Sequence, residues 1–490
     1  MVKNLTFIED TQLLQVLRGF NPWWIVGEVP ATLAKPVRRL AFYEISNFLQ
    51  RTDFHRAILV SGARRVGKTT ILYQLAQEAI REGMKPSQIM YASFDHPILK
   101  LASLERIIEV FRNNVAGGAE LLLFFDEVHY APDWNLWLKL TVDRYPNYKI
   151  VATGSASSIL DVQGAESGVG RWIEIKIPTL SFYEYLELLG LPRPDFPRDI
   201  KPTQIHNLSR PEAQDVLNKC LPLEPHFHRY LLVGGFPETA LMQDTLSAQR
   251  LLREDVVDKV LKRDMTALYG VRNVLDLERL FIYLCMHTGQ ILVQDTIAKE
   301  IGVSRVTVSN DLKYLEMANL IYRSEPTDLE GKRILKAKPK VYLADPAIRN
   351  AVLLKGDEVL ADPIEMGIIV ETAVFKHLAA FYFKERPRIG YWRETKTNKE
   401  VDIVVELPNT NSIIAEIKYR EDPSISAQEG IISFIRSRKV ASALLVTKTS
   451  RDFGAVELSA LRDLPVKPFR IPAFVFLYLL GHAEHAAFIR

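Results

Sequence analysis

A glycine-containing run that ends in lysine and threonine carries the groups that bind a phosphate chain. It reads Gly62, Ala63, Arg64, Arg65, Val66, Gly67, Lys68 and Thr69, and Thr70 follows it. The glycines let backbone N–H groups curl around a β-phosphate. Lys68 can reach the β- and γ-phosphates, and the Thr69 hydroxyl can ligate Mg²⁺. The run therefore predicts a binding site for a nucleoside triphosphate, ATP, with its Mg²⁺ ion.

The elements on either side of this run suit the same chemistry. Residues 57–60 are apolar and predict a buried strand, whereas residues 70–82 have the pattern of an amphipathic helix. The positive end of the helix dipole then faces the phosphates. A chance match in a glycine-containing turn is the alternative, and the strand–loop–helix order disfavours it.

An acidic pair further along the chain supplies the second half of a hydrolytic site. Five apolar residues, 121–125, predict a strand buried on both faces, and Asp126 and Glu127 follow it directly. Asp126 can hold the water shell of Mg²⁺ opposite Thr69, and Glu127 can polarise the attacking water. The alternative is an ordinary acidic exit from a strand. The presence of Lys68 upstream favours the catalytic interpretation.

The order of the expected elements indicates the fold. Further strands are expected at residues 89–94 and 149–152, and strands that alternate with helices predict a doubly wound parallel α/β sheet. The inserted strand and the glutamate beside Asp126 resemble the additional-strand branch of phosphate-loop ATPases, which includes the AAA+ group. That resemblance implies that Thr153 and Ser155 orient the lytic water. A plain turn after a strand is the alternative.

The same resemblance bears on one arginine. Arg171 precedes a strand expected at residues 172–177. In AAA+ proteins an arginine in this region often reaches the γ-phosphate of a neighbouring subunit, where it stabilises transition-state charge. An internal salt bridge is the equally weighted alternative. A finger role would require a homo-oligomer.

Composition limits the other function classes. The net charge of +3 is too small to indicate a nucleic-acid binder by itself, so any such surface must be local. Cys220 and Cys285 lack ligand spacing and predict neither a disulfide framework nor a zinc site. The first ten residues lack an apolar signal region, and the longest apolar run, 473–480, is too short to span a membrane. We therefore expect a cytoplasmic protein without a membrane partner.

The length of 490 residues predicts about three domains. The prefix contains Trp23 and Trp24, which are expected either to pack at the edge of the sheet or to form an adenine platform. A proline-rich stretch follows the ATPase core. The expected segments are a prefix at 1–50, the AAA+-like core at 51–190, a helical lid region at 191–275, a winged helix-turn-helix at 276–345 and a nuclease-like domain at 346–490.

The pattern at 276–345 predicts the winged helix. A helix at 296–301, a tight turn, a helix at 305–317 and a hairpin from 321 to 343 form this arrangement. Residues expected to face the core are Val306, Val308, Leu312 and Leu315.

The polar residues of this region predict contact with DNA. Those expected to reach base edges are Ser304, Arg305, Thr307, Ser309 and Asn310, and those expected to reach phosphates are Lys332, Arg333, Lys336, Lys338 and Lys340. A protein-contact module, or lysines that merely protect a sheet edge, are the alternatives. Residues suited to base edges and residues suited to phosphates occur together in this region, which favours DNA.

Acidic residues in the last third of the chain predict a second site. Glu416 and Lys418 share one face of a strand at 413–418, and Asp402 lies on a strand at 401–405. Asp402 and Glu416 can bind Mg²⁺ or Mn²⁺. Lys418 can activate a water nucleophile or stabilise the transition state. A surface ion pair of small energy is the alternative.

These residues resemble the PD-(D/E)xK nuclease fold. The match comprises Glu371 on a helix, Asp402, and Glu416 followed two positions later by Lys418. Val401 stands where the proline of the motif would be. Gln428 offers a weak extension of the site. The resemblance implies a metal-dependent nuclease site at Glu371, Asp402, Glu416 and Lys418.

The whole chain resembles the prokaryotic AAA-14-like ATPases that carry a C-terminal domain of unknown function similar to DUF4143. The resemblance rests on these motifs: Asn21 to Trp24, Gly62 to Thr70, Phe125 to His129, Thr153 to Ser155, Gly170 and Arg171, Leu180 to Glu184, Gly234 to Pro237, Tyr342 to Asp345, and Glu416 to Lys418. It implies ATP binding and supplies no substrate. We expect an ATP-hydrolysing machine that acts on DNA. The alternative is a nucleotide-controlled switch or transcriptional regulator with a non-catalytic nuclease-like scaffold. A small-molecule kinase would need neither Glu127 nor the winged helix.

Overall fold

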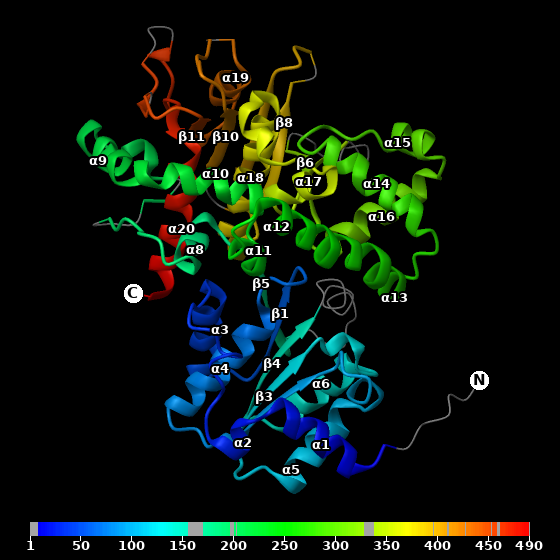
Figure 1. Ribbon diagram of the computed structural model, residues 1–490. Coiled ribbons are helices and arrows are strands. Elements are labelled where there is room, and N and C mark those ends of the chain that lie inside the picture. The colour runs from blue at the N-terminus through cyan, green and yellow to red at the C-terminus, as the bar shows by residue number, and fades with distance from the viewer. Residues whose placement is uncertain are drawn as a thin grey trace. The chain divides into compact units, whose positions relative to one another are not determined.

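The computed structural model describes residues 8–154, 170–196, 200–201, 203–327, 338–394, 396–408, 411–426, 428–451, 453–457 and 461–489. The chain divides into two compact units, Met1–Ile177 and Pro178–Arg490, and each is considered by itself (Figure 1). No helix in the described part of the chain is long and apolar enough to cross a membrane.

The N-terminal unit is built on a parallel sheet, which confirms the predicted α/β class. Its described strands run in the order β2-β3-β4-β1-β5. Strand β4 therefore lies between the strand before the phosphate loop and the strand that ends at Asp126. The strands β1 and β3 are buried along their whole length, as expected where helices cover both faces of a sheet. The strands are β1 (Ala57–Gly62), β2 (Ile89–Ser93), β3 (Leu121–Asp126), β4 (Tyr148–Gly154) and β5 (Trp172–Ile177).

Helices cover this sheet on both sides. Helices α3 and α4 lie on one side and α6 on the other (Figure 1). Side chains of α1, α5 and α6 share a hydrophobic core with alternate residues of β2, β3 and β4. The helices are α1 (Asp10–Phe20), α2 (Trp23–Val26), α3 (Leu40–Gln50), α4 (Lys68–Arg81), α5 (Leu104–Asn114) and α6 (Trp134–Arg144), and short 3₁₀ turns occur at Pro86–Gln88, Leu99–Leu101 and Val128–Tyr130.

The prefix covers the edge strand of this sheet. The Asn21 side chain donates to the carbonyl of Tyr91 at 2.8 Å and accepts from the amide of Tyr91 at 2.6 Å, as a neighbouring strand would. The indole N–H groups of Trp23 and Trp24 donate to the carbonyl of Ile89 at 3.1 and 2.8 Å. Edge strands present unpaired polar groups that proteins commonly cover. The two tryptophans therefore pack at the sheet edge, one of the two alternatives from the sequence.

The C-terminal unit is built on a mixed sheet. The described strands run in the order β12-β13-β11-β10-β9-β8-β6-β7. One face packs against α18 and α20, and the other packs against α19. The strands are β6 (Ile321–Pro326), β7 (Lys340–Leu343), β8 (Arg388–Arg393), β9 (Glu400–Glu406), β10 (Ser412–Lys418), β11 (Val440–Thr447), β12 (Gly454–Ala455) and β13 (Phe469–Pro472).

Strand β6 joins the hairpin β6–β7 to the rest of this sheet. Glu325 and Pro326 pair in parallel with Gly390 and Tyr391 of β8. A Cβ atom at Gly390 would lie 2.0 Å from the Glu325 carbonyl oxygen, so the junction needs a glycine. The predicted hairpin and the predicted nuclease-like strands thus form one continuous sheet.

Helices from the predicted lid region share a core with C-terminal helices. Val216, Phe227 and Leu231 belong to the same hydrophobic cluster as Phe375 and Leu477. The five sequence segments themselves stay a prediction. The helices are α8 (Phe182–Leu188), α9 (Arg210–Cys220), α10 (Glu224–Val233), α11 (Pro237–Ala240), α12 (Thr245–Leu251), α13 (Met265–Tyr269), α14 (Val274–Met286), α15 (Gln294–Ile301), α16 (Arg305–Met317), α17 (Pro346–Leu353), α18 (Pro363–Phe381), α19 (Gly430–Ser437) and α20 (Ala473–Ile489), with π-helical turns at Leu252–Asp258 and Val260–Asp264 and 3₁₀ turns at Ile205–Asn207, Leu221–Leu223, Asp357–Ala361 and Phe383–Glu385.

Helices α15 and α16 and the antiparallel pair β6–β7 follow one another in the predicted order. Val308, Leu312 and Leu315 are buried at helical spacing. The expectation for Val306 is wrong, because it is 67% exposed. Two positions along a helix correspond to about 200° of rotation, so Val306 lies opposite the buried face.

Candidate functional site

The phosphate loop connects β1 to the N-terminus of α4. The helix begins at Lys68, two residues before its predicted start, and Gly67 precedes it with a left-handed φ of 96°. At Gly62 a Cβ atom would lie 2.4 Å from the carbonyl oxygen of Ile177, so the close approach of β5 requires glycine. Arg39 donates to the carbonyl of Val66 at 2.9 Å and ties the loop to the prefix.

The loop residues have the placement expected of a phosphate site. Ala63 and Val66 are buried, Arg64 and Arg65 are half-buried, and Thr70 lies in the first turn of α4. The buried Lys68 ammonium donates to the carbonyl oxygens of Gly62 and Ala63 at 3.0 and 3.1 Å, over the loop itself. Positive charge and the helix N-terminus therefore meet at one end of β1.

Asp126 lies at the end of β3 and accepts three hydrogen bonds from hydroxyl groups. Thr69 and Tyr91 donate to Oδ2 at 2.7 Å each, and Thr153 donates to Oδ1 at 2.5 Å. Burial raises the pKa of Asp126, the charge of Glu127 adds to this, and the three hydroxyls oppose it. The structure thus brings Thr69 and Asp126 together, the two residues predicted to hold Mg²⁺. Their oxygens fit that ion, because hard oxygen donors are what Mg²⁺ prefers.

Thr153 of β4 touches both acidic residues. Its hydroxyl donates to Asp126 and accepts from the backbone N–H of Glu127 at 3.0 Å. The contact is available because β4 lies directly beside β3 in the sheet. Ser155, the other predicted sensor residue, lies outside the described residues. Glu127 itself has a left-handed φ of 51°, which turns the chain after β3.

His129 packs beside the predicted water-activating carboxylate. Its Nδ1 lies 3.5 Å from Glu127 Oε2. Burial, reinforced by the charge of Lys68, lowers the pKa of His129 to about 3. The imidazole is therefore neutral near neutral pH, and its contact with Glu127 is not an ion pair.

Tyr91 is a site residue that the sequence argument missed. It lies on β2, which pairs with β3, and its ring stacks on Tyr73 with centroids 4.6 Å apart. Asn21 holds its backbone, so the prefix fixes the strand that presents the hydroxyl to Asp126. The alternation of β2 indicates which residues share a face, but not that this face reaches Asp126.

Arg171 has a partner within the same unit. Its Nε lies 3.1 Å from Asp143 Oδ1, and both side chains are partly exposed. This is the internal salt bridge that formed one of the two alternatives. The finger role stays a prediction.

The predicted C-terminal residues come from three elements of the second unit. Glu371 lies on α18, Asp402 on β9, and Glu416 and Lys418 on β10. Lys418 Nζ lies 2.9 Å from Glu416 and 3.4 Å from Glu429, a partner that the sequence argument missed. Asp402 Oδ2 accepts from the backbone N–H of Ile417 at 2.9 Å. The predicted extension, Gln428, is exposed.

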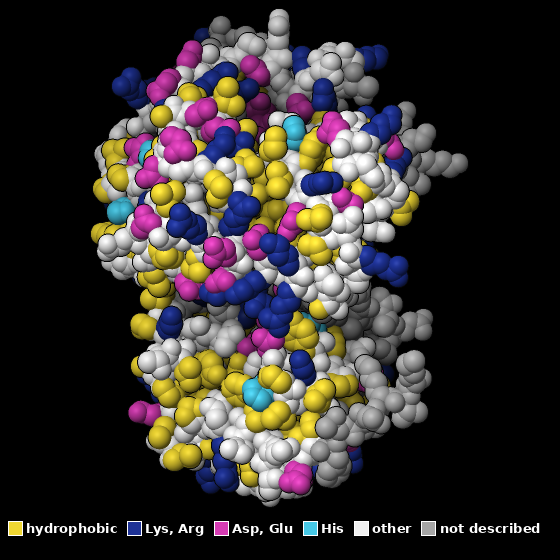
Figure 2. Space-filling model, turned by 45° about the vertical axis from the view of Figure 1, so that its right-hand side comes forward, with side chains coloured by type: hydrophobic (Ala, Val, Ile, Leu, Met, Phe, Trp, Pro, Cys, Tyr) yellow, Lys and Arg dark blue, Asp and Glu magenta, His cyan; other side chains and the backbone are white. Residues whose placement is uncertain are grey.

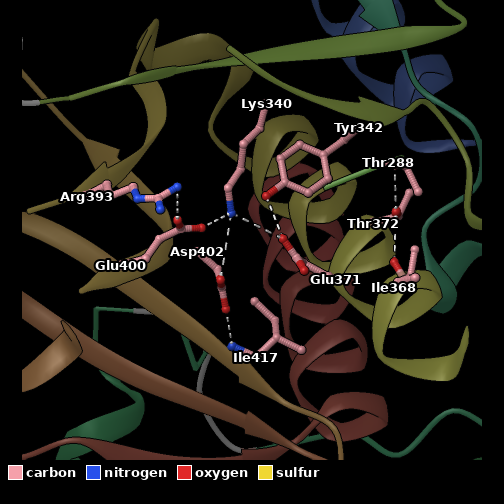
Figure 3. A network of polar contacts seen from close by, with 10 residues as sticks. All are labelled: Thr288, Lys340, Tyr342, Ile368, Glu371, Thr372, Arg393, Glu400, Asp402 and Ile417. Atoms are coloured by element: carbon pink, nitrogen blue, oxygen red, sulfur yellow. Dashed lines mark hydrogen bonds and ion pairs between the residues drawn. The ribbon is translucent and has the colours of Figure 1, made fainter. Parts of the chain in front are cut away.

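A lysine occupies the space between these carboxylates. Lys340 Nζ lies 2.5 Å from Glu400, 3.8 Å from Glu371 and 3.8 Å from Asp402 (Figure 3). We call these four residues the Lys340 cluster. The expectation that Lys340 is a surface cation of the wing is wrong, because its side chain is only 3% exposed. A buried ammonium needs such partners.

The charges in this region shift several pKa values. Burial, followed by the charge of Asp402, raises the pKa of Glu371 to about 7 and that of Glu416 to about 8. Burial opposes the charge of Lys340, but the carboxylates of Glu371, Asp402 and Glu400 outweigh it and raise its pKa. Within the described residues, no group of three or more His, Cys, Asp and Glu side chains is arranged to hold a metal ion. The predicted residues are neighbours, but around an ammonium they do not fit a divalent cation.

Family models match three parts of the chain. Residues 54–186 match an AAA domain, and residues 224–358 and 366–464 match two domains of unknown function, DUF8612 and DUF4143. The first match covers the phosphate loop and Asp126. The third covers Glu371, Asp402, Glu416 and Lys418.

The similar curated proteins give no activity to transfer. An uncharacterized protein of Haemophilus influenzae is 25% identical over 66% of this chain and 77% of its own length. Two uncharacterized proteins of Methanocaldococcus jannaschii are 24% and 25% identical, over 71% and 74% of this chain and 71% and 76% of their own lengths.

Among solved structures, AMPPCP-bound DnaA from Aquifex aeolicus is 17% identical, with a TM-score of 0.25, over 57% of this chain and 88% of that chain. The Hsp104–casein complex of S. cerevisiae is 20% identical, with a TM-score of 0.29, over 61% of this chain and 52% of that chain. TM-scores this low carry no argument about ligands or partners. The family matches and the phosphate-loop geometry support nucleotide binding and hydrolysis, and the chain therefore combines an AAA domain of the P-loop ATPase type with a C-terminal DUF4143 domain.

Proposed function

We propose that this protein is a Mg²⁺-dependent ATPase that acts on DNA through α16 and the hairpin β6–β7. The hydrolytic part of the proposal rests on the contact between Thr69 and Asp126 beside Lys68 and Glu127. Residues that bind phosphate, hold a metal ion and activate water then meet at the carboxyl ends of β1 and β3, on either side of β4, where parallel sheets bind ligands.

Each residue has a role that follows from its position. Lys68 binds the β- and γ-phosphates, and Thr69 and Asp126 would hold Mg²⁺. The ion, when bound, neutralises charge on the phosphates. Glu127 orients the attacking water and takes its proton. The Thr153 hydroxyl fixes the carboxylate of Asp126 and the backbone N–H of Glu127. Replacing Lys68 by Ala should abolish ATP turnover while the protein stays folded, and retained turnover would exclude this assignment.

The first turns of α16 support contact with DNA. Arg305, Ser309 and Asn310 are exposed there, and Ser304 caps the helix by accepting from the amide of Thr307 at 3.0 Å. Arginine and asparagine are the side chains that most often read guanine and adenine. The exposed Val306 can contact a thymine methyl group.

Lysines at the end of the hairpin supply the proposed phosphate contacts. Lys338 is exposed, whereas Lys332, Arg333 and Lys336 lie outside the described residues. On the face seen in Figure 2, basic and acidic side chains both occur, in keeping with the small net charge. Binding must therefore depend on a local surface.

The test is ATP turnover with and without duplex DNA at two salt concentrations. We expect DNA to stimulate the wild type and to lose this effect in the Arg305→Ala/Asn310→Ala variant. Arg279→Ala, which removes another largely exposed arginine, from α14, is the matched control and should retain stimulation. Stimulation should weaken at higher salt. A wild type that neither binds DNA nor responds to it contradicts the proposal.

The Lys340 cluster favours a second candidate. An ammonium among the predicted nuclease carboxylates supports a nucleotide-controlled switch whose C-terminal domain is a non-catalytic scaffold. Such a switch would hydrolyse ATP slowly and retain nucleotide tightly. Single-turnover hydrolysis and nucleotide release rates separate it from a DNA-stimulated machine.

A further inference from the structure

The Lys340 cluster gathers carboxylates from different parts of the C-terminal unit. Glu371 projects from helix α18, whereas Glu400 and Asp402 come from strand β9 (Figure 3). Converging carboxylate oxygens on separate elements are the ligands that Mg²⁺ and Mn²⁺ take in proteins. Here their oxygens instead lie between 2.5 and 3.8 Å from the ammonium of Lys340.

Strand β7 places the Lys340 ammonium among these carboxylates. Lys340 and Tyr342 share one face of the strand because they are two residues apart. Tyr342 donates to Glu371 Oε1 at 2.7 Å, beside the Lys340 contact with the same oxygen. The Lys340 ammonium also lies 5.4 Å from the centre of the Tyr391 ring, a cation–π distance. The cation is therefore fixed by charged, hydrogen-bonding and aromatic partners.

Glu416, on the strand that pairs with the strand of Asp402, is a further buried carboxyl group of this region. Its side chain is only 9% exposed, and its Oε2 atom is buried without a hydrogen-bond partner in the described structure. Buried polar atoms normally have a partner. Its other oxygen is bound by Lys418 at 2.9 Å. The charge of Asp402 acts on Glu416, so the two predicted metal ligands are neighbours.

We propose that the Lys340 ammonium takes the place of a divalent cation in this cluster, so that the cluster binds Mn²⁺ or Mg²⁺ only after the lysine is removed. The C-terminal domain then performs no metal-dependent phosphodiester hydrolysis. Lys340 instead locks β7 to α18 and β9. The proposal concerns this unit alone, and its outcome is independent of ATP hydrolysis and of DNA stimulation.

The test is Mn²⁺ binding to the full chain without nucleotide, followed by electron paramagnetic resonance of the free ion. Lys340→Met removes the ammonium, and with it the position that the ion would occupy, and keeps an unbranched apolar stem. We expect it to bind one Mn²⁺ ion more than the wild type and to lose that ion when Asp402→Asn is added. Lys338→Met, two residues away and exposed, is the matched control and should behave as the wild type.

Each result decides the proposal. Wild-type binding that Asp402→Asn abolishes would overturn it, because the cluster would then hold a metal beside Lys340. A folded Lys340→Met protein that binds no additional ion would also overturn it. If Lys340→Met does not fold alone, refolding in millimolar Mn²⁺ but not in metal-free buffer with chelator supports the proposal. Failure to refold with Mn²⁺ counts against it, since a bound ion would stabilise the folded state.

Discussion

The two carboxylate centres of this protein satisfy buried negative charge in opposite ways. In the N-terminal unit, the partners of Asp126 are the hydroxyls of Thr69, Tyr91 and Thr153. In the C-terminal unit, the partner shared by Glu371, Glu400 and Asp402 is the Lys340 ammonium. Hydroxyls orient a carboxylate without neutralising it, so the first centre still attracts a cation. The second centre already contains a cation that the chain itself supplies.

This difference shows that an acidic sequence motif alone does not identify a metal site. Both centres contain acidic residues at the ends or on the faces of adjacent strands, as the sequence predicts. What distinguishes them is the charge of the group between those residues. A buried carboxylate without a cation has a raised pKa, because burial penalises its charge. A cation bound at the first centre would lower this cost, as Lys340 partly does at the second, where burial still raises the pKa of Glu371.

The largest expected effect tests the centre at Asp126 and Glu127. Replacing Glu127 by Gln should lower ATP turnover by about 10²- to 10⁴-fold, the usual contribution of a general base, while ATP still binds. Steady-state turnover and nucleotide affinity should be measured together. Equal losses in the Glu416→Gln variant would show that the effect is not specific to the first centre.

The next largest effect tests the Lys340 cluster. Lys340→Met should destabilise the C-terminal unit by about 3–5 kcal/mol, because it leaves buried carboxylates without their counterion. Denaturant dependence of hydrogen exchange in β9 and β10 measures this locally. Lys338→Met should change the same exchange rates little. An unchanged stability in Lys340→Met would mean that the cluster does not depend on its ammonium.

The pH dependence of the stability of the C-terminal unit tests its buried carboxyl groups. Folding raises the pKa of Glu371 to about 7 and of Glu416 to about 8 from a usual value of 4.5, so the folded state binds more protons in that range. Stability of the C-terminal unit should therefore fall as pH rises from about 4.5 to 8. Exchange in β10, corrected for its intrinsic pH dependence, should show this. Glu416→Gln should flatten the slope, and an unchanged slope would argue against a raised pKa at Glu416.

The smallest effect concerns the orientation of Asp126. Tyr91→Phe removes one hydrogen bond to the carboxylate and should weaken binding of Mg²⁺–ATP by about tenfold, equivalent to about 1.4 kcal/mol. Calorimetry of nucleotide binding measures this change. Tyr145→Phe loses a surface contact with Arg112 at 3.0 Å and should bind as the wild type does. Equal affinities for all three proteins would remove Tyr91 from the site.

The contact between Thr69 and Asp126 in the first centre could be anticipated because the information for it is local. Lys68 and Thr69 are adjacent, Asp126 and Glu127 are adjacent, and each pair follows a strand whose apolar run is evident. The parallel sheet then brings the strand ends together. Tyr91 escapes prediction because its role depends on the register of β2 against β3, which no short motif encodes.

The second centre is less predictable because its decisive residue is remote from the motif. Lys340 lies far from Asp402 along the chain, next to lysines that suggest a basic hairpin. The signal available was the alternation of Lys340 and Tyr342 on one strand face, which is too common to be specific. For Arg171, the sequence left two alternatives, and the contact with Asp143 describes one of them without excluding the other.

The glycine at the junction between β6 and β8 has a mechanical consequence. Because Gly390 lets Glu325 and Pro326 join the larger sheet, and Lys340 ties the next strand to β9, the hairpin is held to that sheet at two points. A load applied to α16 would be shared across the sheet instead of bending a linker. The DUF4143 region and the hairpin would then move together as one rigid body.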